Sequence, residues 1–109
     1  MGITRIVQLQ FKPGVDTDVI EDLSSQIRGM KAKCLDAETK KPYIESIEGG
    51  PDISIEGLQQ GITHAFIIKF NNSVDRDYYA LKDPAHQAVI QALQPAIDKV
   101  QIIDLATSG

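Results

Sequence analysis

Two stretches of this sequence, residues 3–11 and 62–70, alternate between apolar and polar side chains. Because successive side chains of a β-strand point to opposite faces, the alternation predicts two strands that each bury one face against a core. Weaker patterns predict two more strands, over residues 42–47 and 101–105. The glycine-rich segment 48–61 is predicted to be a loop.

Helical periodicity fills the intervals between these strands. Apolar residues recur every three or four positions over residues 17–35, and Asp18 with Glu21 fits a capping box at the start of that helix. A short helix is predicted over residues 74–81. A longer helix begins at Pro84, because proline is well tolerated in the first helical turn. A second proline eleven residues later, at position 95, should bend or tighten its end.

The order β-α-β-β-α-β predicts one ferredoxin-like α+β domain over residues 1–109, with an antiparallel sheet and helices on one face. The net charge is −4 and the two signs are interspersed, so the sequence lacks the basic stripe of a nucleic-acid-binding protein. No apolar run is long enough to span a bilayer, and no leader segment is visible. The single cysteine excludes an internal disulfide. We expect a cytoplasmic protein that binds neither nucleic acid nor a membrane.

Three polar residues occupy positions that the periodicity assigns to the core. Arg5 shares the parity of the apolar residues in its strand, and so does His64 in the strand over residues 62–70. His86 falls inside the apolar stripe of the helix that begins at Pro84. Burying such groups is costly unless they are paired or hydrated. Each could therefore be a satisfied core group, or the three could together line a polar pocket between sheet and helices.

Such a pocket supports a limited chemistry. A histidine near its usual pKa can transfer a proton at neutral pH, and an arginine can hold a carboxylate or an enolate oxygen. We expect the His86 ring to reach the cavity that Arg5 and His64 also line, and to be kept neutral by the helix N-terminus. Tyr78 and Tyr79 could add a phenol to its mouth or serve in packing.

Other catalytic patterns are missing from the sequence. It contains no nucleophile elbow, no glycine-rich phosphate loop and no zinc-ligand spacing, so we expect neither a metal nor a cofactor. Cys34 lies on the apolar side of its predicted helix, which favours a small core residue over a nucleophile.

Three segments resemble the stress-responsive A/B barrel (Dabb) family. They are ITRIVQLQFKPG at residues 3–14, EGLQQGITHAF at residues 56–66 and YALKDPAH at residues 79–86. The resemblance implies a homodimeric α+β barrel, in which two ferredoxin-like subunits pack their open sheet faces together. The open face fits this implication, since it carries Ile6 and Ile67 among polar residues.

The family includes stress-response proteins without assigned chemistry and a plant polyketide (olivetolic acid) cyclase that works without cofactors. In the pattern of that cyclase, the histidine of Pro-Ala-His is the base and a tyrosine on the same helix assists. The resemblance therefore implies that His86 is a catalytic base and that Tyr79 is its proton partner. In an alignment without gaps, the position of that tyrosine corresponds to Ala80 in this sequence. Tyr79 aligns with it only after a one-residue shift.

Arg5, His64 and Tyr78 are then the expected substrate-binding residues, with Arg5 in place of a first-strand histidine common in the family. Two functions remain open. The first is a cofactor-independent lyase or cyclase that acts on a polyketide-like or other carbonyl compound. The second is a non-catalytic dimer that responds to stress or binds a small molecule.

Overall fold

The two alternating segments form the central strands of one sheet. In the computed structural model, which describes residues 1–107, β1 (Gly2–Phe11) lies between β3 (His64–Phe70) and β4 (Ile97–Thr107). β2 (Ile44–Pro51) pairs with the other side of β3, so the strand order is β2-β3-β1-β4. All three pairings are antiparallel. The sheet is therefore the one that a ferredoxin-like order predicts.

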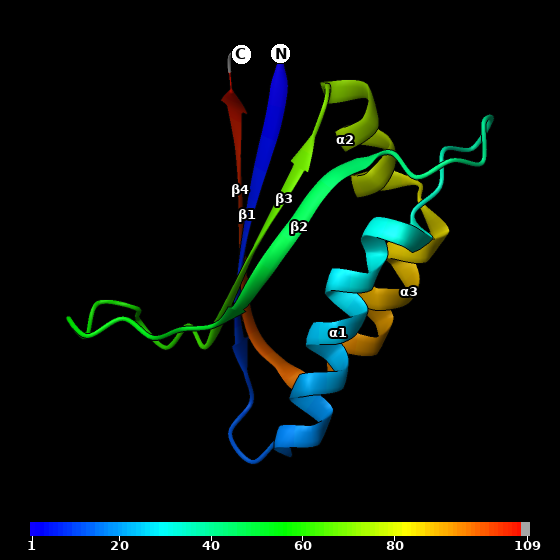
Figure 1. The fold of residues 1–109 in the computed structure, drawn as a ribbon. Helices are drawn as coiled ribbons and strands as arrows, with labels where there is room; N and C mark the ends of the chain where they lie inside the picture. Colours follow the sequence, from blue (N-terminus) through cyan, green and yellow to red (C-terminus); the bar gives the residue numbers. More distant parts are fainter. Residues whose placement is uncertain (108–109) are drawn as a thin grey trace.

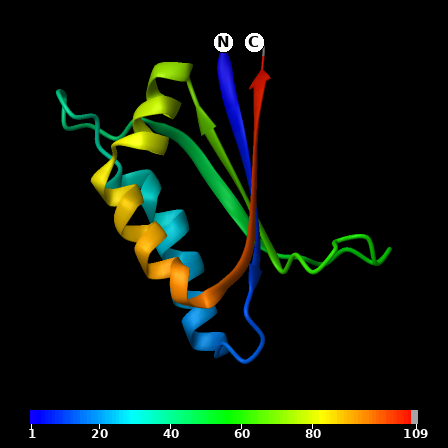
Figure 2. The same cartoon turned by 180° about the vertical axis from the view of Figure 1, so that it is seen from behind.

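Three helices cover one face of this sheet (Figure 1). They are α1 (Thr17–Lys33), α2 (Ser73–Leu81) and α3 (Pro84–Leu93). The view from behind shows the same layering, and within residues 1–107 no helix lies on the opposite face (Figure 2). The chain passes from α3 into β4 through a short 3₁₀ turn, η1 (Gln94–Ala96), which confirms that the proline at position 95 tightens the end of the helix.

The core lies between the helices and the inner face of the sheet. Its buried members come from every strand except β4 and from all three helices. Those on the two central strands have the predicted parity: Ile3, Leu9, Phe11, Phe66, Ile68 and Phe70. The apolar repeat of α1 buries Leu23, Ile27 and Met30. The apolar side chains of the strand pattern and of the helix pattern therefore pack in the same core.

The predicted capping box at the start of α1 was wrong. Asp16 is the N-cap residue, and its side chain makes no capping hydrogen bond. Asp18 consequently lies inside the first turn, where its carboxylate contributes through the helix dipole instead of through a cap.

The predicted limits of the two edge strands were also wrong. β2 extends to Pro51, because Gly49 and Gly50 continue the pairing with β3 instead of opening a loop. β4 runs over Ile97–Thr107, well beyond the predicted residues 101–105, because it pairs with β1 along the whole length of that strand. The loop between β2 and β3 is therefore residues 52–63.

Candidate functional site

A cavity of about 410 Å³ lies between the sheet and the helices. Its lining comes from β1, β3, β4 and all three helices, and most of it is aliphatic. The polar lining residues are Arg5, Tyr79 and His86. The expected polar pocket is thus a mainly apolar cavity in which three polar side chains meet. A volume of this size falls within the range of about 300–1,000 Å³ that is usual for small-molecule sites.

His86 is placed by the junction between α2 and α3. α2 ends at Leu81, and Asp83 caps α3 by accepting a hydrogen bond from the Ala85 amide at 2.8 Å. His86 is the third residue of α3, and helical side chains tilt toward the N-terminus of their helix. Its ring therefore meets the last turn of α2, where Nδ1 lies 2.7 Å from the carbonyl oxygen of Tyr79.

This contact fixes the tautomer of the neutral imidazole. A carbonyl oxygen can only accept, so His86 Nδ1 carries the proton and donates it to Tyr79. Nε2 is then left with a free lone pair, and it is the basic atom of the ring. Burial lowers the pKa of His86 below its usual value of 6.5, and the Arg5 charge acts in the same direction. The hydrogen bond to Tyr79 opposes this shift without cancelling it, so the ring is neutral at pH 7.

Tyr79 makes a second contact with the His86 ring, through its own aromatic ring. The Tyr79 and His86 rings stack with centroids 3.8 Å apart and an angle of 16° between their planes. Tyr79 is only 2% exposed, and its hydroxyl donates a long hydrogen bond to Met30 Sδ at 3.9 Å. Burial raises the pKa of that hydroxyl. The structure thus places Tyr79 beside His86, with its phenol hydrogen-bonded to the thioether in the core.

Arg5 points inward from β1, as its parity predicts, and is 7% exposed. Its guanidinium binds Asp104 on β4 through two hydrogen bonds, Nε to Oδ1 at 2.9 Å and Nη2 to Oδ2 at 3.1 Å. Arg76 on α2 donates to the same Oδ2 at 2.9 Å. Burial alone would raise the pKa of Asp104, but the hydrogen bonds and charges of the two arginines outweigh it and hold that pKa below its ordinary value.

Sequence reasoning missed Asp104. The signal was present, since Asp104 has the same parity as the half-exposed Ile102, which lines the cavity from β4. An acidic residue on the core-facing side of a strand requires a cation, and Arg5 is the residue directly opposite it in the β1–β4 register.

His64 lies outside this cavity, which corrects its predicted place. It points to the inner face as expected, but it pairs with Leu9, whereas Arg5 pairs with Ile68. At about 3.3 Å per residue, these positions are separated by about 13 Å along the sheet. The His64 ring instead meets Phe11 edge-on, with centroids 4.9 Å apart, and its Nδ1 lies 3.0 Å from Thr63 Oγ1. Burial lowers the pKa of His64.

Tyr78 also lies outside the cavity. Neighbouring residues of a helix point about 100° apart, so only one of the two tyrosines can face the sheet. Tyr79 does so, and Tyr78 turns toward the start of β2, where its ring packs edge-on against Tyr43 at 5.7 Å. The ungapped alternative to Tyr79, Ala80, does line the cavity, but it brings no hydroxyl.

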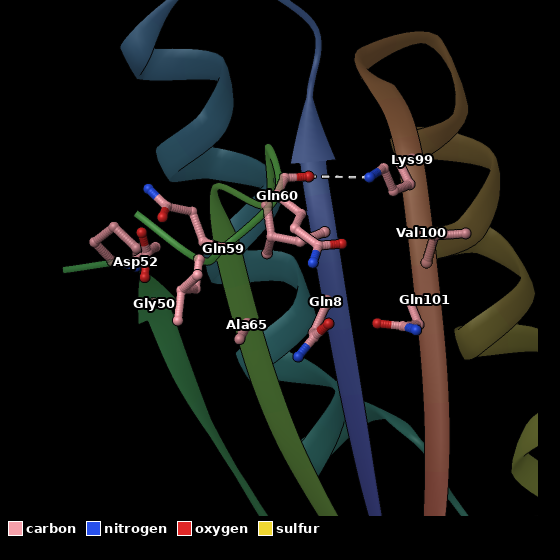
Figure 3. Close-up of a pocket in the computed structure, with 12 residues that line it drawn as sticks. Gln8, Gly50, Asp52, Gln59, Gln60, Ala65, Lys99, Val100 and Gln101 are labelled. Carbon is pink, nitrogen blue, oxygen red and sulfur yellow. Dashed lines mark hydrogen bonds between the residues drawn. The ribbon is translucent and has the colours of Figure 1, made fainter. Parts of the chain in front are cut away.

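A larger hollow of about 720 Å³ lies on the opposite, open face of the sheet, at the base of the loop between β2 and β3 (Figure 3). Side chains of Gln8, Gln60 and Gln101 line it, and the Lys99 amine donates to the Gln60 carbonyl at 3.0 Å. Neither histidine reaches this hollow. Besides glutamine amides, its polar lining consists of Asp52 and Lys99, and the Lys99 amine is already hydrogen-bonded to the Gln60 carbonyl.

Residues 1–107 contain no helix that is both long and apolar enough to cross a membrane. Within the same residues, no group of three or more histidine, cysteine, aspartate or glutamate side chains is arranged to hold a metal ion. Cys34 is fully buried, and burial, together with the nearby Asp83, raises the pKa of its thiol to about 12.

Comparisons with known proteins agree on the fold. The hydroxynitrile lyase from Passiflora edulis superposes with a TM-score of 0.84 and 16% identity, covering 98% of this chain and 94% of that chain. A dimeric ferredoxin-like protein of unknown function from Jannaschia sp. CCS1 gives a TM-score of 0.78 and 18% identity, covering 98% and 100%. At these identities the likeness concerns the ferredoxin-like fold.

Two sequence comparisons go further. The stress-response A/B barrel domain-containing protein HS1 from Arabidopsis thaliana is 31% identical over 102 residues, which are 94% of this chain and 86% of that protein. The sequence model of the Stress responsive A/B Barrel Domain (Dabb) matches residues 3–107. Since this match spans nearly the whole chain, the protein belongs to the stress-responsive A/B barrel domain family.

Proposed function

We propose that this protein is a cofactor-independent enzyme of the lyase or cyclase type, which removes a proton from a small carbonyl compound with His86 as general base. One observation carries the proposal. His86 Nδ1 donates to the Tyr79 carbonyl at 2.7 Å, so a neutral ring at the cavity has Nε2 as its basic atom. A neutral histidine with a fixed tautomer is suited to accept a proton from a substrate.

The other polar groups of the cavity take complementary roles. Proton removal next to a carbonyl develops negative charge on the oxygen, and a positioned cation stabilises such charge. Arg5 supplies that cation, and Asp104 holds its guanidinium in place. Tyr79 acts as a positioning residue through its carbonyl oxygen and its stacked ring. The apolar remainder of the lining favours a substrate with an apolar body, such as a polyketide-like compound.

One fold neighbour is named a hydroxynitrile lyase, so a known enzyme of the lyase class has this architecture. That likeness supports the fold as a scaffold for an enzyme, while the assignment of His86 rests on the contacts described above.

We further propose that the protein works as a homodimer joined through the open faces of its sheets. Several aliphatic side chains on this side are exposed, among them Ile103 and Leu105 on β4. The loop of residues 52–63 projects from the sheet away from the helices and carries Ile55, which is 97% exposed (Figure 1). Apolar surface of this kind is typical of an interface. A fold neighbour, the Jannaschia protein, is named as dimeric.

Sedimentation velocity at micromolar concentration tests the dimer. We expect twice the mass of 12.0 kDa for the protein, and the monomer mass for Ile103→Lys, which places a charge in the interface. Val19→Lys is the matched control, since Val19 is 45% exposed on α1 and Ile103 is 43% exposed on the open face. A monomeric wild type would refute the proposal.

A non-catalytic binding role is the second candidate, and one observation favours it. The hydrogen bond between His86 and the Tyr79 carbonyl also holds α3 against α2. This is a structural role that requires no reaction. In that case His86→Ala should reduce stability without removing any turnover.

Proton exchange in D₂O separates the two candidates. A panel of ketones and diketones with apolar side groups is incubated with the protein, and NMR follows the loss of the protons next to the carbonyl. The proposed enzyme accelerates exchange for at least one compound, and His86→Gln abolishes the acceleration while circular dichroism shows an intact fold. His64→Gln is the matched control, because His64 lies outside the cavity and should leave exchange unchanged. Full exchange by His86→Gln would refute the assignment.

A further inference from the structure

Among residues 1–107, Arg5 is the only charged residue that lines the cavity. Two of its N–H groups, on Nε and Nη2, are taken by Asp104. A guanidinium has five N–H groups, so both protons of Nη1 and the second proton of Nη2 remain. Within residues 1–107, no hydrogen bond from Nη1 is found. One complete edge of the Arg5 fork is therefore unpartnered. The residue as a whole is only 7% exposed, but within residues 1–107 the one fully buried side-chain polar atom without a partner is Ser24 Oγ, so Arg5 Nη1 keeps accessible surface.

The geometry of this free edge selects a particular kind of ligand. The Nη1 and Nη2 N–H groups of an arginine are parallel, and they match the two oxygens of a carboxylate better than a single carbonyl oxygen. Asp104 neutralises Arg5 only in part, because Arg76 shares the same carboxylate oxygen Oδ2. Arg76 in turn binds Asp77, which is largely exposed at the surface. No acidic side chain of the described residues lines the cavity to compete for the free edge.

The walls of the cavity define the rest of the ligand. Apart from Arg5, Tyr79 and His86, the lining consists of aliphatic side chains and Met30. Two of the aliphatic residues, Val100 and Ile102 on the edge strand β4, are 53% and 50% exposed. They mark a mouth at the β4 edge, through which a small molecule can enter with Arg5 in the buried part of the site.

We infer that the ligand of this cavity is a small monocarboxylic acid with an apolar body, whose carboxylate is held by the Nη1–Nη2 edge of Arg5. The inference rests on the proposed function in one respect, namely that this cavity is the ligand-binding site. It does not require that His86 catalyse a reaction. It also narrows the substrate class, because the carbonyl compound of the proposed reaction would then carry a carboxylate.

Matched acids and amides test the inference without any change to the protein. Ligand-observed NMR titrations at neutral pH compare hexanoate with hexanamide and phenylacetate with phenylacetamide. We expect each acid to bind wild type at least about tenfold more tightly than its amide, because the arginine fork forms charge-assisted hydrogen bonds with a carboxylate that a neutral amide cannot match. Equal affinities of acid and amide, or no binding of either acid, would overturn the inference.

Variants then test whether Arg5 causes the preference for acids over amides. Arg5→Gln should lose it, whereas Arg28→Gln, which removes the same charge from the exposed face of α1, should retain it. Because Arg5→Gln leaves Asp104 without its main partner, the double variant Arg5→Gln/Asp104→Asn is measured beside it, with circular dichroism as the test of folding. A folded variant that lacks Arg5 and still prefers acids would overturn the inference.

The two proposals can fail separately. If the acids bind through Arg5 but no compound shows proton exchange, the catalytic proposal fails and the carboxylate site stands. If exchange depends on His86 while acids and amides bind equally, the carboxylate site fails and the catalytic proposal stands.

Discussion

The His86 Nδ1 atom lies 2.7 Å from the carbonyl oxygen of Tyr79, and the rings of the same two residues stack 3.8 Å apart. Both contacts bridge the break between α2 and α3. The hydrogen bond sets which nitrogen carries the proton, and the stack sets the plane of the ring. Tyr79 can therefore orient His86 through its backbone and its ring face, without any use of its hydroxyl group.

Replacement of Tyr79 separates these contributions. Tyr79→Phe keeps the carbonyl and the stack but loses the weak hydrogen bond to Met30, so we expect it to lower the free energy of unfolding by about 1 kcal/mol and to retain proton exchange. Tyr79→Leu loses the stack and leaves a void, which should cost about 2–4 kcal/mol and reduce exchange at least about tenfold. Urea unfolding and the NMR exchange assay measure both effects. Complete loss of exchange in Tyr79→Phe would instead give the hydroxyl the proton-partner role that the family resemblance implies.

The buried histidine should make stability depend on pH. The folded-state pKa of His86 is lowered below its usual value of 6.5, so the unfolded state binds the proton more readily. The stability that this group contributes is complete above the unfolded-state pKa of 6.5 and is lost as the pH falls through the lower folded-state pKa. Urea unfolding from about pH 8 to pH 5 should show this decline, above the range where carboxylates titrate.

His64 provides the comparison for that experiment, since burial lowers its pKa as well. His86→Gln and His64→Gln should each flatten the pH dependence, and the double variant should remove it within this range. An unchanged slope in the double variant would mean that neither histidine carries the effect.

A second buried contact holds α3 in place. The Tyr43 hydroxyl donates to Asp83 Oδ2 at 2.5 Å, and Asp83, which is 1% exposed, uses its other oxygen to cap α3. Tyr43→Phe leaves this buried carboxylate one donor short and should lower the free energy of unfolding by about 1.5–3 kcal/mol. Tyr78→Phe is the matched control, because no hydrogen bond of the Tyr78 hydroxyl is found within residues 1–107 and its loss should be small. Equal losses in thermal or urea unfolding would contradict this account.

The sequence predicted most of the fold because strand and helix periods report directly which side chains face a core. The inward positions of Arg5 and His64 followed from strand parity alone. What parity cannot provide is position along the strand. Only the pairing of β1 with β3 shows that Arg5 and His64 lie at different ends of the sheet. In the same way, helix periodicity could not decide between Tyr78 and Tyr79, because that choice depends on where α2 sits over the sheet.

The end of β2 could not be predicted for a different reason. Glycines ordinarily indicate a turn, so the sequence pattern predicts a loop at Gly49 and Gly50. In the structure they belong to the strand, where glycine marks a close approach between backbones. Gly49 pairs with Phe66, and a Cβ atom added to it would lie 2.3 Å from the Ala65 carbonyl oxygen and 2.6 Å from Phe66 Cα.

The two neighbouring glycines therefore provide a paired test of this strand. Gly49→Ala must push β2 away from β3, because the atoms that it meets are backbone atoms that cannot rotate aside, and we expect a loss of about 1–3 kcal/mol. Within residues 1–107, Gly50→Ala has no atom within 4 Å of the added Cβ, so its effect should lie between zero and a stabilisation of about 1 kcal/mol from reduced freedom of the unfolded chain. Urea unfolding gives both free energies, and amide hydrogen exchange of β2 reports the pairing directly. If the two variants were equally stable and equally protected, Gly49 would not be under the steric constraint that the structure shows.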